Sequence, residues 1–160
     1  MDTEILEQIL KFWFIKDAKN KIWFQRDKRK LSLLDLKITQ KYNNFLKFLE
    51  NNNILKNYLY TISPKYCLSI IICLDQFSRH IYRNNTNKSK IIENTLRASD
   101  ISMYLIKKYR LRYIFNSEEL IFILMPLKHL DSYLNFSVLQ NVIYNYNNQS
   151  LIICNSNLKS

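Results

Sequence analysis

Residues 63–83 read SPKYCLSIIICLDQFSRHIYR, and this segment decides the predicted fold. A serine at position 63 can accept a hydrogen bond from a free amide of a first helical turn, and Pro64 fits the next position because it needs no donor there. Isoleucines within residues 69–74 could also suit a buried strand. The length of roughly twenty residues and the start signal favour a helix. We therefore predict a helix from about Pro64 to Arg83.

On a helical wheel this segment has one apolar face and a separate polar arc. The apolar face comprises Tyr66, Ile70, Leu74, Phe77 and Ile81. The polar arc comprises Lys65, Ser69, Gln76, Arg79 and Arg83, with Asp75 at its edge, and Leu68 and Ile72 interrupt it. The pattern predicts that the first half of the helix is buried nearly all round and that the second half opens onto a polar surface or pocket.

Asp75, Arg79 and Arg83 are spaced four residues apart, so they lie above one another on a helix and can form charge-assisted hydrogen bonds. Such a series is common on solvated helix faces that bind nothing. Arginines can also hold a carboxylate or a phosphate through paired hydrogen bonds. The spacing alone leaves both interpretations open.

The segment LDQFSRHIYR resembles the LDQF-x-R-N-x-x-R signature of an uncharacterised family, the domain of unknown function numbered nine hundred and twenty-four. Further segments resemble other elements of that family in the same order: ILKFWF, WFQRD, LDLKI with Tyr42, and MPLKHLD. Together they span roughly residues 5–140. The resemblance implies an all-helical fold similar to tetratricopeptide repeats and a functional surface, and it implies no particular activity.

Three residues depart from the pattern of that family. His80 stands where the family usually has Asn, and Lys128 and Asp131 each stand where it usually has Glu. Because Lys128 inverts the charge, any role of the family's glutamate at that position does not carry over to this chain.

The composition limits the classes of function. At 160 residues the chain suits one domain with a substantial core. The 24 Lys and Arg against 13 Asp and Glu would normally indicate nucleic acid. However, Lys, Ile, Asn and Tyr are abundant, as in proteins from AT-rich genomes, so we expect no nucleic-acid partner. The chain has no Gly, which excludes phosphate loops and dinucleotide-binding turns because these need glycine for close backbone approach.

The cysteines and the apolar runs indicate a compartment. Cys67, Cys73 and Cys154 form no CxxC pair, which predicts buried, reduced thiols and therefore a reducing compartment. No signal peptide opens the chain, and no apolar run approaches the roughly 18 residues of a membrane span. We expect a soluble cytoplasmic protein with no membrane partner.

Capping residues and periodicity predict further helices. The first carries Ile5, Leu6, Ile9, Leu10, Trp13 and Phe14. Others are predicted from Leu31 to about Leu49, from Ser89 to about Tyr109, from Asn116 to a break or kink at Pro126, and from about Ser132 to Tyr144. Residues 54–62 suit either a short helix or an ordered loop.

These elements predict an all-α fold of antiparallel helical hairpins in one domain, residues 1–145. The Asn-rich tail at residues 146–160 is expected to be poorly ordered except where LIIC docks. No pattern of about 34 residues repeats along the chain. A tetratricopeptide-like right-handed array is therefore implied by the family resemblance alone.

The chain contains two histidines, His80 and His129, and no HExxH motif or cysteine cluster, so we expect neither a metal nor a cofactor. A lone histidine is most often structural. His129, with Asp131 nearby to orient its ring, nevertheless has the parts of a general base or an anion-binding donor. The candidate ligand-binding residues are Asp75, Gln76, Arg79, Arg83 and His129, and the candidate catalytic residues are His129 and Asp131.

Three hypotheses remain, and the sequence favours the first. A helical binding module would take an anionic small molecule or an acidic peptide in a groove lined by Gln76, Arg79, Arg83 and His129. An enzyme would act on a phosphorylated or carboxylated small substrate. An RNA-binding protein would use the basic residues within 16–30 and 107–112. The oligomeric state stays open.

If the two family motifs form one site, their polar side chains should meet at the mouth of a concave pocket. We expect Arg79 or Arg83 within about 8 Å of His129 or Asp131, close enough to share one bound anion. Without a ligand, Asp75 and Asp131 should neutralise the arginines, because buried charges are costly when unpaired.

Overall fold

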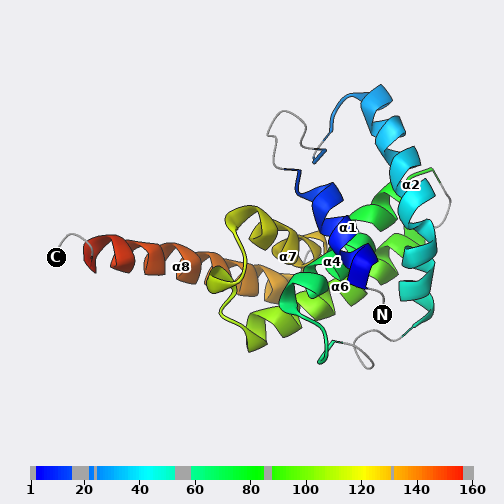
Figure 1. The fold of residues 1–160 in the computed structure, drawn as a ribbon. Helices are drawn as coiled ribbons and strands as arrows, with labels where there is room; N and C mark the ends of the chain where they lie inside the picture. Colours follow the sequence, from blue (N-terminus) through cyan, green and yellow to red (C-terminus); the bar gives the residue numbers. More distant parts are fainter. Residues whose placement is uncertain are drawn as a thin grey trace.

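The computed structural model describes residues 3–15, 22–23, 25–52, 59–84, 88–130 and 132–156. Within these ranges all regular secondary structure is helical and no strand is present (Figure 1). The predicted all-α class is therefore confirmed. The predictions for Asp131, Phe24, residues 54–58 and the Cys154 side chain lie outside what the structure describes.

The described part of the chain contains the following helical elements, in chain order. They are α1 (Thr3–Trp13), α2 (Lys28–Asn51), α4 (Pro64–Ile71), the π-helical turn η2 (Ile72–Phe77), α5 (Ser78–Ile81), α6 (Lys88–Lys108), the 3₁₀ turn η3 (Leu111–Tyr113), α7 (Ser117–His129) and α8 (Tyr133–Ser156).

The predicted central helix is present as the continuous run α4, η2 and α5. The Ser63 hydroxyl accepts a hydrogen bond from the Tyr66 amide at 3.3 Å, and Pro64 occupies the first turn, as predicted. The run ends at Ile81, two residues before Arg83. Its middle is a π turn, in which each amide bonds one residue further back than in an α-helix. Neither the periodicity nor the composition indicated that turn.

The central run is surrounded by the other long helices. The helix α1 packs on α4, α2 packs on η2 and α5, and α6 packs along α4 and η2 (Figure 1). Residues 67–75 are all buried, which confirms that the first half of the run is enclosed. Burial raises the pKa of the Cys67 thiol to about 12, so Cys67 is a neutral core residue.

The helix α7 begins with a capping box and continues past its proline. The Asn116 side chain accepts from the Glu119 amide, and the Glu119 side chain accepts from the Asn116 amide, both at 2.9 Å. The predicted break at Pro126 does not occur. Proline removes one backbone hydrogen bond from a helix, but Pro126 and Leu127 are buried, and their packing holds the last turn in helical form as far as His129.

The helix α8 projects away from the rest of the fold (Figure 1). It extends to Ser156, whereas the sequence predicted its end near Tyr144. Asparagine-rich segments lower helix propensity without forbidding a helix, and no proline or glycine interrupts this one. No helix in the described part of the chain combines the length and apolarity needed to cross a membrane.

Candidate functional site

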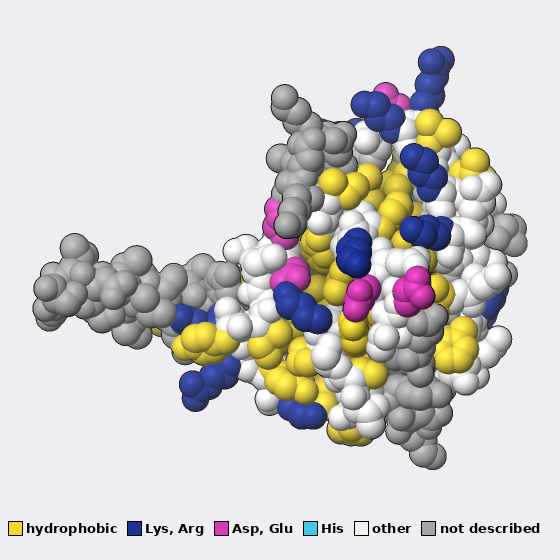
Figure 2. Space-filling view, viewed as in Figure 1, with side chains coloured by type: hydrophobic (Ala, Val, Ile, Leu, Met, Phe, Trp, Pro, Cys, Tyr) yellow, Lys and Arg dark blue, Asp and Glu magenta, His cyan; other side chains and the backbone are white. Residues whose placement is uncertain are grey.

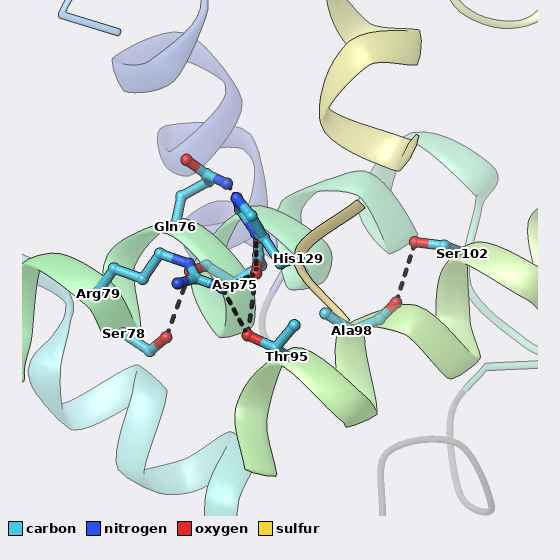
Figure 3. A network of polar contacts seen from close by, with 8 residues as sticks. All are labelled: Asp75, Gln76, Ser78, Arg79, Thr95, Ala98, Ser102 and His129. Carbon is cyan, nitrogen blue, oxygen red and sulfur yellow. Dashed lines mark hydrogen bonds and ion pairs between the residues drawn. The ribbon is translucent and has the colours of Figure 1, made fainter. Parts of the chain in front are cut away.

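The centre of the candidate site is a buried carboxylate. Asp75 lies in the π turn η2 and is 0 % exposed. Its two oxygens contact four polar side chains (Figure 3): Gln76 Nε2 at 2.6 Å, Arg79 Nη2 at 3.2 Å, Thr95 Oγ1 at 3.1 Å and His129 Nδ1 at 2.9 Å. A buried carboxylate requires such donors, because an unpaired charge away from water is expensive.

The four donors come from three elements. Gln76 and Arg79 follow Asp75 on the central run, Thr95 comes from α6, and His129 comes from the last turn of α7. The Arg79 Nη2 atom also donates to Thr95 Oγ1 at 3.0 Å. The network therefore ties η2, α6 and α7 together at one point. It also explains why the continuation of α7 past Pro126 matters, since a helix broken there would not place His129 on Asp75.

The donors keep Asp75 ionised. Burial alone would raise the pKa of this carboxyl group, but the hydrogen bond and charge of His129 and the charge of Arg79 outweigh burial and hold its pKa below the ordinary value. An ionised carboxylate can only accept hydrogen bonds, so His129 must carry its proton on Nδ1.

A second carboxylate, Asp35 of α2, holds the next polar residues of the central run. Its Oδ1 atom lies 2.6 Å from His80 Nδ1, and its Oδ2 atom accepts from Arg83 Nε at 2.9 Å. Burial lowers the pKa of His80 more than the contact with Asp35 raises it. Arg83 thus pairs with α2, and of the predicted series of three charged residues only Asp75 and Arg79 contact each other.

A pocket of about 250 Å³ lies beside these two clusters. Its polar wall consists of Gln76, Arg79, His80 and Arg83, its aromatic wall consists of Trp13, Trp23 and Phe122, and Ile22, Gln25 and Leu31 complete it. The Trp23 indole donates from Nε1 to the Trp13 carbonyl oxygen at 2.7 Å, and its ring centroid lies 4.9 Å from that of Phe122. These contacts fix the aromatic wall.

Two buried donors of pocket-lining residues have no hydrogen-bond partner among the described residues. They are Nε of Arg79 and Nε1 of Trp13. Most buried donors in folded proteins are satisfied, so an unsatisfied one calls for an explanation. Neither atom has accessible surface, so a ligand in the pocket can pair with them only if the side chains move.

The structure brings most of the predicted site residues together. Arg79 Nη2 and His129 Nδ1 both lie within 3.2 Å of the same Asp75 oxygen, so the expected approach to within about 8 Å is confirmed. Gln76, Arg79 and Arg83 line the pocket, whereas His129 is not part of its lining. Asp75 neutralises Arg79 as expected, but Arg83 is neutralised by Asp35.

Sequence reasoning missed several contributors to this site, among them Asp35, Thr95, Trp13, His80 and Phe122. Asp35 and Thr95 lie on helices far along the chain from the motif, and no spacing rule links them to it. Trp13 was assigned to the core, and His80 was noted only as a departure from the family. The order of the family-like segments was the one available signal, because it placed LDLKI, which contains Asp35, among them.

The charged side chains do not form a continuous basic surface on the face that Figure 2 shows. Lys and Arg are dispersed there among hydrophobic and acidic side chains (Figure 2). Within the described residues, no three His, Cys, Asp or Glu side chains converge as they would around a metal ion.

Residues 9–151 match the profile of the family described as "Bacterial protein of unknown function (DUF924)". The chain belongs to the DUF924 family. No curated protein and no solved structure matches it. Both motifs that build the site lie within the matched DUF924 range. Of the departures from the DUF924 pattern, His80 lines the pocket, and Lys128 is exposed beside His129.

Proposed function

We propose that this DUF924 protein is a binding module for a small anionic ligand that also carries an apolar or aromatic group. One observation carries the proposal: the guanidinium groups of Arg79 and Arg83 line one wall of a pocket whose other wall is aromatic. Guanidinium groups pair with carboxylates and phosphates, and aromatic side chains cover planar apolar groups.

The arginines keep donors for a ligand although each has a carboxylate partner. A guanidinium group has five N–H donors. The contacts of Arg79 with Asp75 and Thr95 use Nη2, and the side chain is 35 % exposed. Arg83 contacts Asp35 through Nε and is 40 % exposed. Both side chains are held in place by their carboxylates, so little side-chain entropy would be lost on binding.

The charge and the size of the pocket limit the ligand. Asp75 and Asp35 balance the two arginines, so the pocket has little excess positive charge. A ligand with one or two negative charges fits this balance better than a polyanion. The volume of about 250 Å³ is below the roughly 300–1,000 Å³ of sites for drug-sized molecules, which favours a small metabolite or one acidic side chain of a peptide.

We also propose that the helices form a tetratricopeptide-like array. The support is that α4, α6 and α7 pack on one another in pairs joined by short connections. In such arrays the groove between helices commonly binds the ligand, and the pocket lies between α1, the central run and α7.

The binding proposal is tested by calorimetry and thermal unfolding with three probes: phenyl phosphate, inorganic phosphate and phenol. We expect phenyl phosphate to bind best because it alone offers both a dianion and a ring. At a concentration of about 100 times its dissociation constant it should add about 2.7 kcal/mol to the free energy of unfolding. Phenol alone should add little.

The variants Arg79→Ala and Arg83→Ala should each weaken binding of phenyl phosphate, while Arg29→Ala, which removes an exposed arginine outside the pocket, should not. Equal binding by wild type and both pocket variants would contradict the proposal. Binding of an acidic peptide but of none of the small probes would favour the peptide alternative.

A further inference from the structure

The ring of His129 is oriented as a proton-transfer group would be. Its Nδ1 atom contacts both oxygens of Asp75, at 2.9 and 3.0 Å. A carboxylate in this position fixes the ring and its tautomer, and it stabilises the imidazolium that forms when Nε2 takes up a proton. The predicted orienting residue was Asp131, which lies outside the described residues, and Asp75 occupies that role in the structure.

The other side of the ring is available. No described residue forms a hydrogen bond with Nε2 of His129, and the side chain is 27 % exposed. His80 offers the comparison within the same chain, because it too contacts a carboxylate through Nδ1 but its side chain is only 11 % exposed. The greater exposure of the His129 ring sets it apart from His80 and leaves room for a ligand atom beside it.

The ring lies next to the proposed anion site. In Figure 3 the His129 ring lies against the Asp75 carboxylate, next to the Gln76 amide. The Arg79 side chain approaches the same carboxylate from the opposite side. Gln76 and Arg79 both line the pocket. An anion held by Arg79 would therefore lie close to His129, which is not itself part of the pocket wall.

We propose that His129 is the general base and acid of a hydrolytic reaction on small anionic esters held by Arg79 in the pocket. This inference rests on the proposed function, because it requires the anion to bind there. The described residues place no serine or cysteine nucleophile in the lining of the pocket, so water is the co-reactant.

The bonds formed and broken and the proton transferred balance with water as the co-reactant. Nε2 of His129 takes a proton from water while the water oxygen forms a bond to the ester carbonyl carbon. The carbon–oxygen bond to the leaving group then breaks, and the leaving oxygen takes the proton back from Nε2. The products are an acid and an alcohol, and the imidazolium between the two steps is balanced by Asp75. General acid–base assistance of this kind contributes on the order of 10²–10⁴ in rate.

The catalytic test uses the mono-4-nitrophenyl ester of terephthalic acid, which offers one carboxylate and one activated ester and whose para carboxylate cannot attack its own ester. Release of 4-nitrophenol by the full-length protein should fall about 100-fold in His129→Gln. In the wild type, the rate should rise with pH as a single general base loses its proton. Lys128→Gln removes an exposed neighbour on the same turn and serves as the matched control, with an unchanged rate. Equal rates in wild type and His129→Gln would overturn the proposal.

A second readout does not depend on the choice of ester. Diethyl pyrocarbonate acylates accessible, unprotonated imidazole nitrogens, and the two histidine peptides can be followed separately by mass spectrometry. We expect His129 to react several-fold faster than His80, and saturating phenyl phosphate to slow the reaction of both histidines, because His80 lines the pocket and His129 lies beside it. Slower reaction of His129 than of His80 would overturn the proposal.

The two proposals fail in different ways. If phenyl phosphate binds by calorimetry but neither protects His129 nor inhibits ester hydrolysis, the catalytic inference is wrong and the binding module stands. If phenyl phosphate does not bind at all, the proposed function is wrong, and the catalytic inference falls with it.

Discussion

His129 and Asp75, which are 54 positions apart in the sequence, meet through a hydrogen bond of 2.9 Å between the imidazole Nδ1 and a carboxylate oxygen. The contact joins the last turn of α7 to the π turn of the central run. It links the two sequence motifs of the DUF924 match in one network, together with Arg79 and Gln76. Both motifs therefore contribute side chains to the same hydrogen-bond network around Asp75.

Removing the Asp75 carboxylate should destabilise the protein. In Asp75→Ala, Arg79, Thr95 and His129 lose a shared acceptor at a fully buried position. Breaking a buried charge pair on one side costs about 3–5 kcal/mol, and partial exposure of Arg79 and His129 places this case near 3 kcal/mol. Urea unfolding measures the change, with the exposed Asp100→Ala as control. A loss below about 1 kcal/mol would show that the network contributes little to stability.

His80 should make stability depend on pH below neutrality. Burial lowers its pKa below the ordinary 6.5, so the unfolded chain binds a proton more readily than the folded chain does. The unfolding free energy should therefore fall as pH is lowered through 6.5, and the contribution of His80 should be fully present above it.

The measurement compares urea unfolding of wild type and His80→Asn at about pH 7.5, 6.5 and 5.5. The difference between the two proteins isolates His80, because every other ionisable group is present in both. A difference that is constant over this range would contradict the lowered pKa of His80.

The fold was predictable because its determinants are local. Ser63 with Pro64, and Asn116 with Glu119, start their helices as capping rules require. The errors also have local causes. Pro126 was expected to break or kink α7, and the helix is not broken, because burial of the last turn outweighs one lost hydrogen bond. The π turn η2 went unnoticed because it changes hydrogen bonding by one residue without altering which side chains are apolar.

The site was predictable only in part because its remaining members are set by tertiary packing. Arg79 and His129 each lie in a short motif that the sequence displays. Thr95 and Asp35 come from α6 and α2, and their contacts depend on how those helices pack against the central run. The i,i+4 spacing correctly predicted the ion pair of Arg79 with Asp75, whereas Arg83 pairs with Asp35 from another helix.

Shortening the buried side chains of the central run should destabilise the protein. Ile70 and Leu74 are 0 % and 1 % exposed, and Leu74 lies within the π turn directly before Asp75. Ile70→Ala and Leu74→Ala should each lower the free energy of unfolding by about 2–5 kcal/mol, because both leave a cavity in a packed core. Leu96→Ala, an exposed position on α6, is the matched control. Losses under about 1 kcal/mol at both buried positions would contradict the described packing.

RNA should bind weakly in spite of the basic composition. Lys28, Arg29 and Lys30 form the exposed first turn of α2. The backbone amides of Arg29 and Lys30 donate hydrogen bonds to the Asp27 side chain there. In the other basic segment, the Lys108 ammonium lies over the rings of Tyr104 and Tyr109, 5.0 and 5.3 Å from their centroids, so it is held by its own chain. Dispersed charges of this kind release few counterions on binding.

We therefore expect no binding of a single-stranded RNA tighter than about 10 μM at about 0.15 M salt, and a shallow dependence of the affinity on salt concentration. Fluorescence anisotropy across a salt series measures both quantities. The matched variant replaces Lys28, Arg29 and Lys30 by Gln, and it should bind as weakly as the wild type. Tight binding by the wild type that is lost in this variant would establish RNA as a partner, because only a phosphate contact at the start of α2 would explain it.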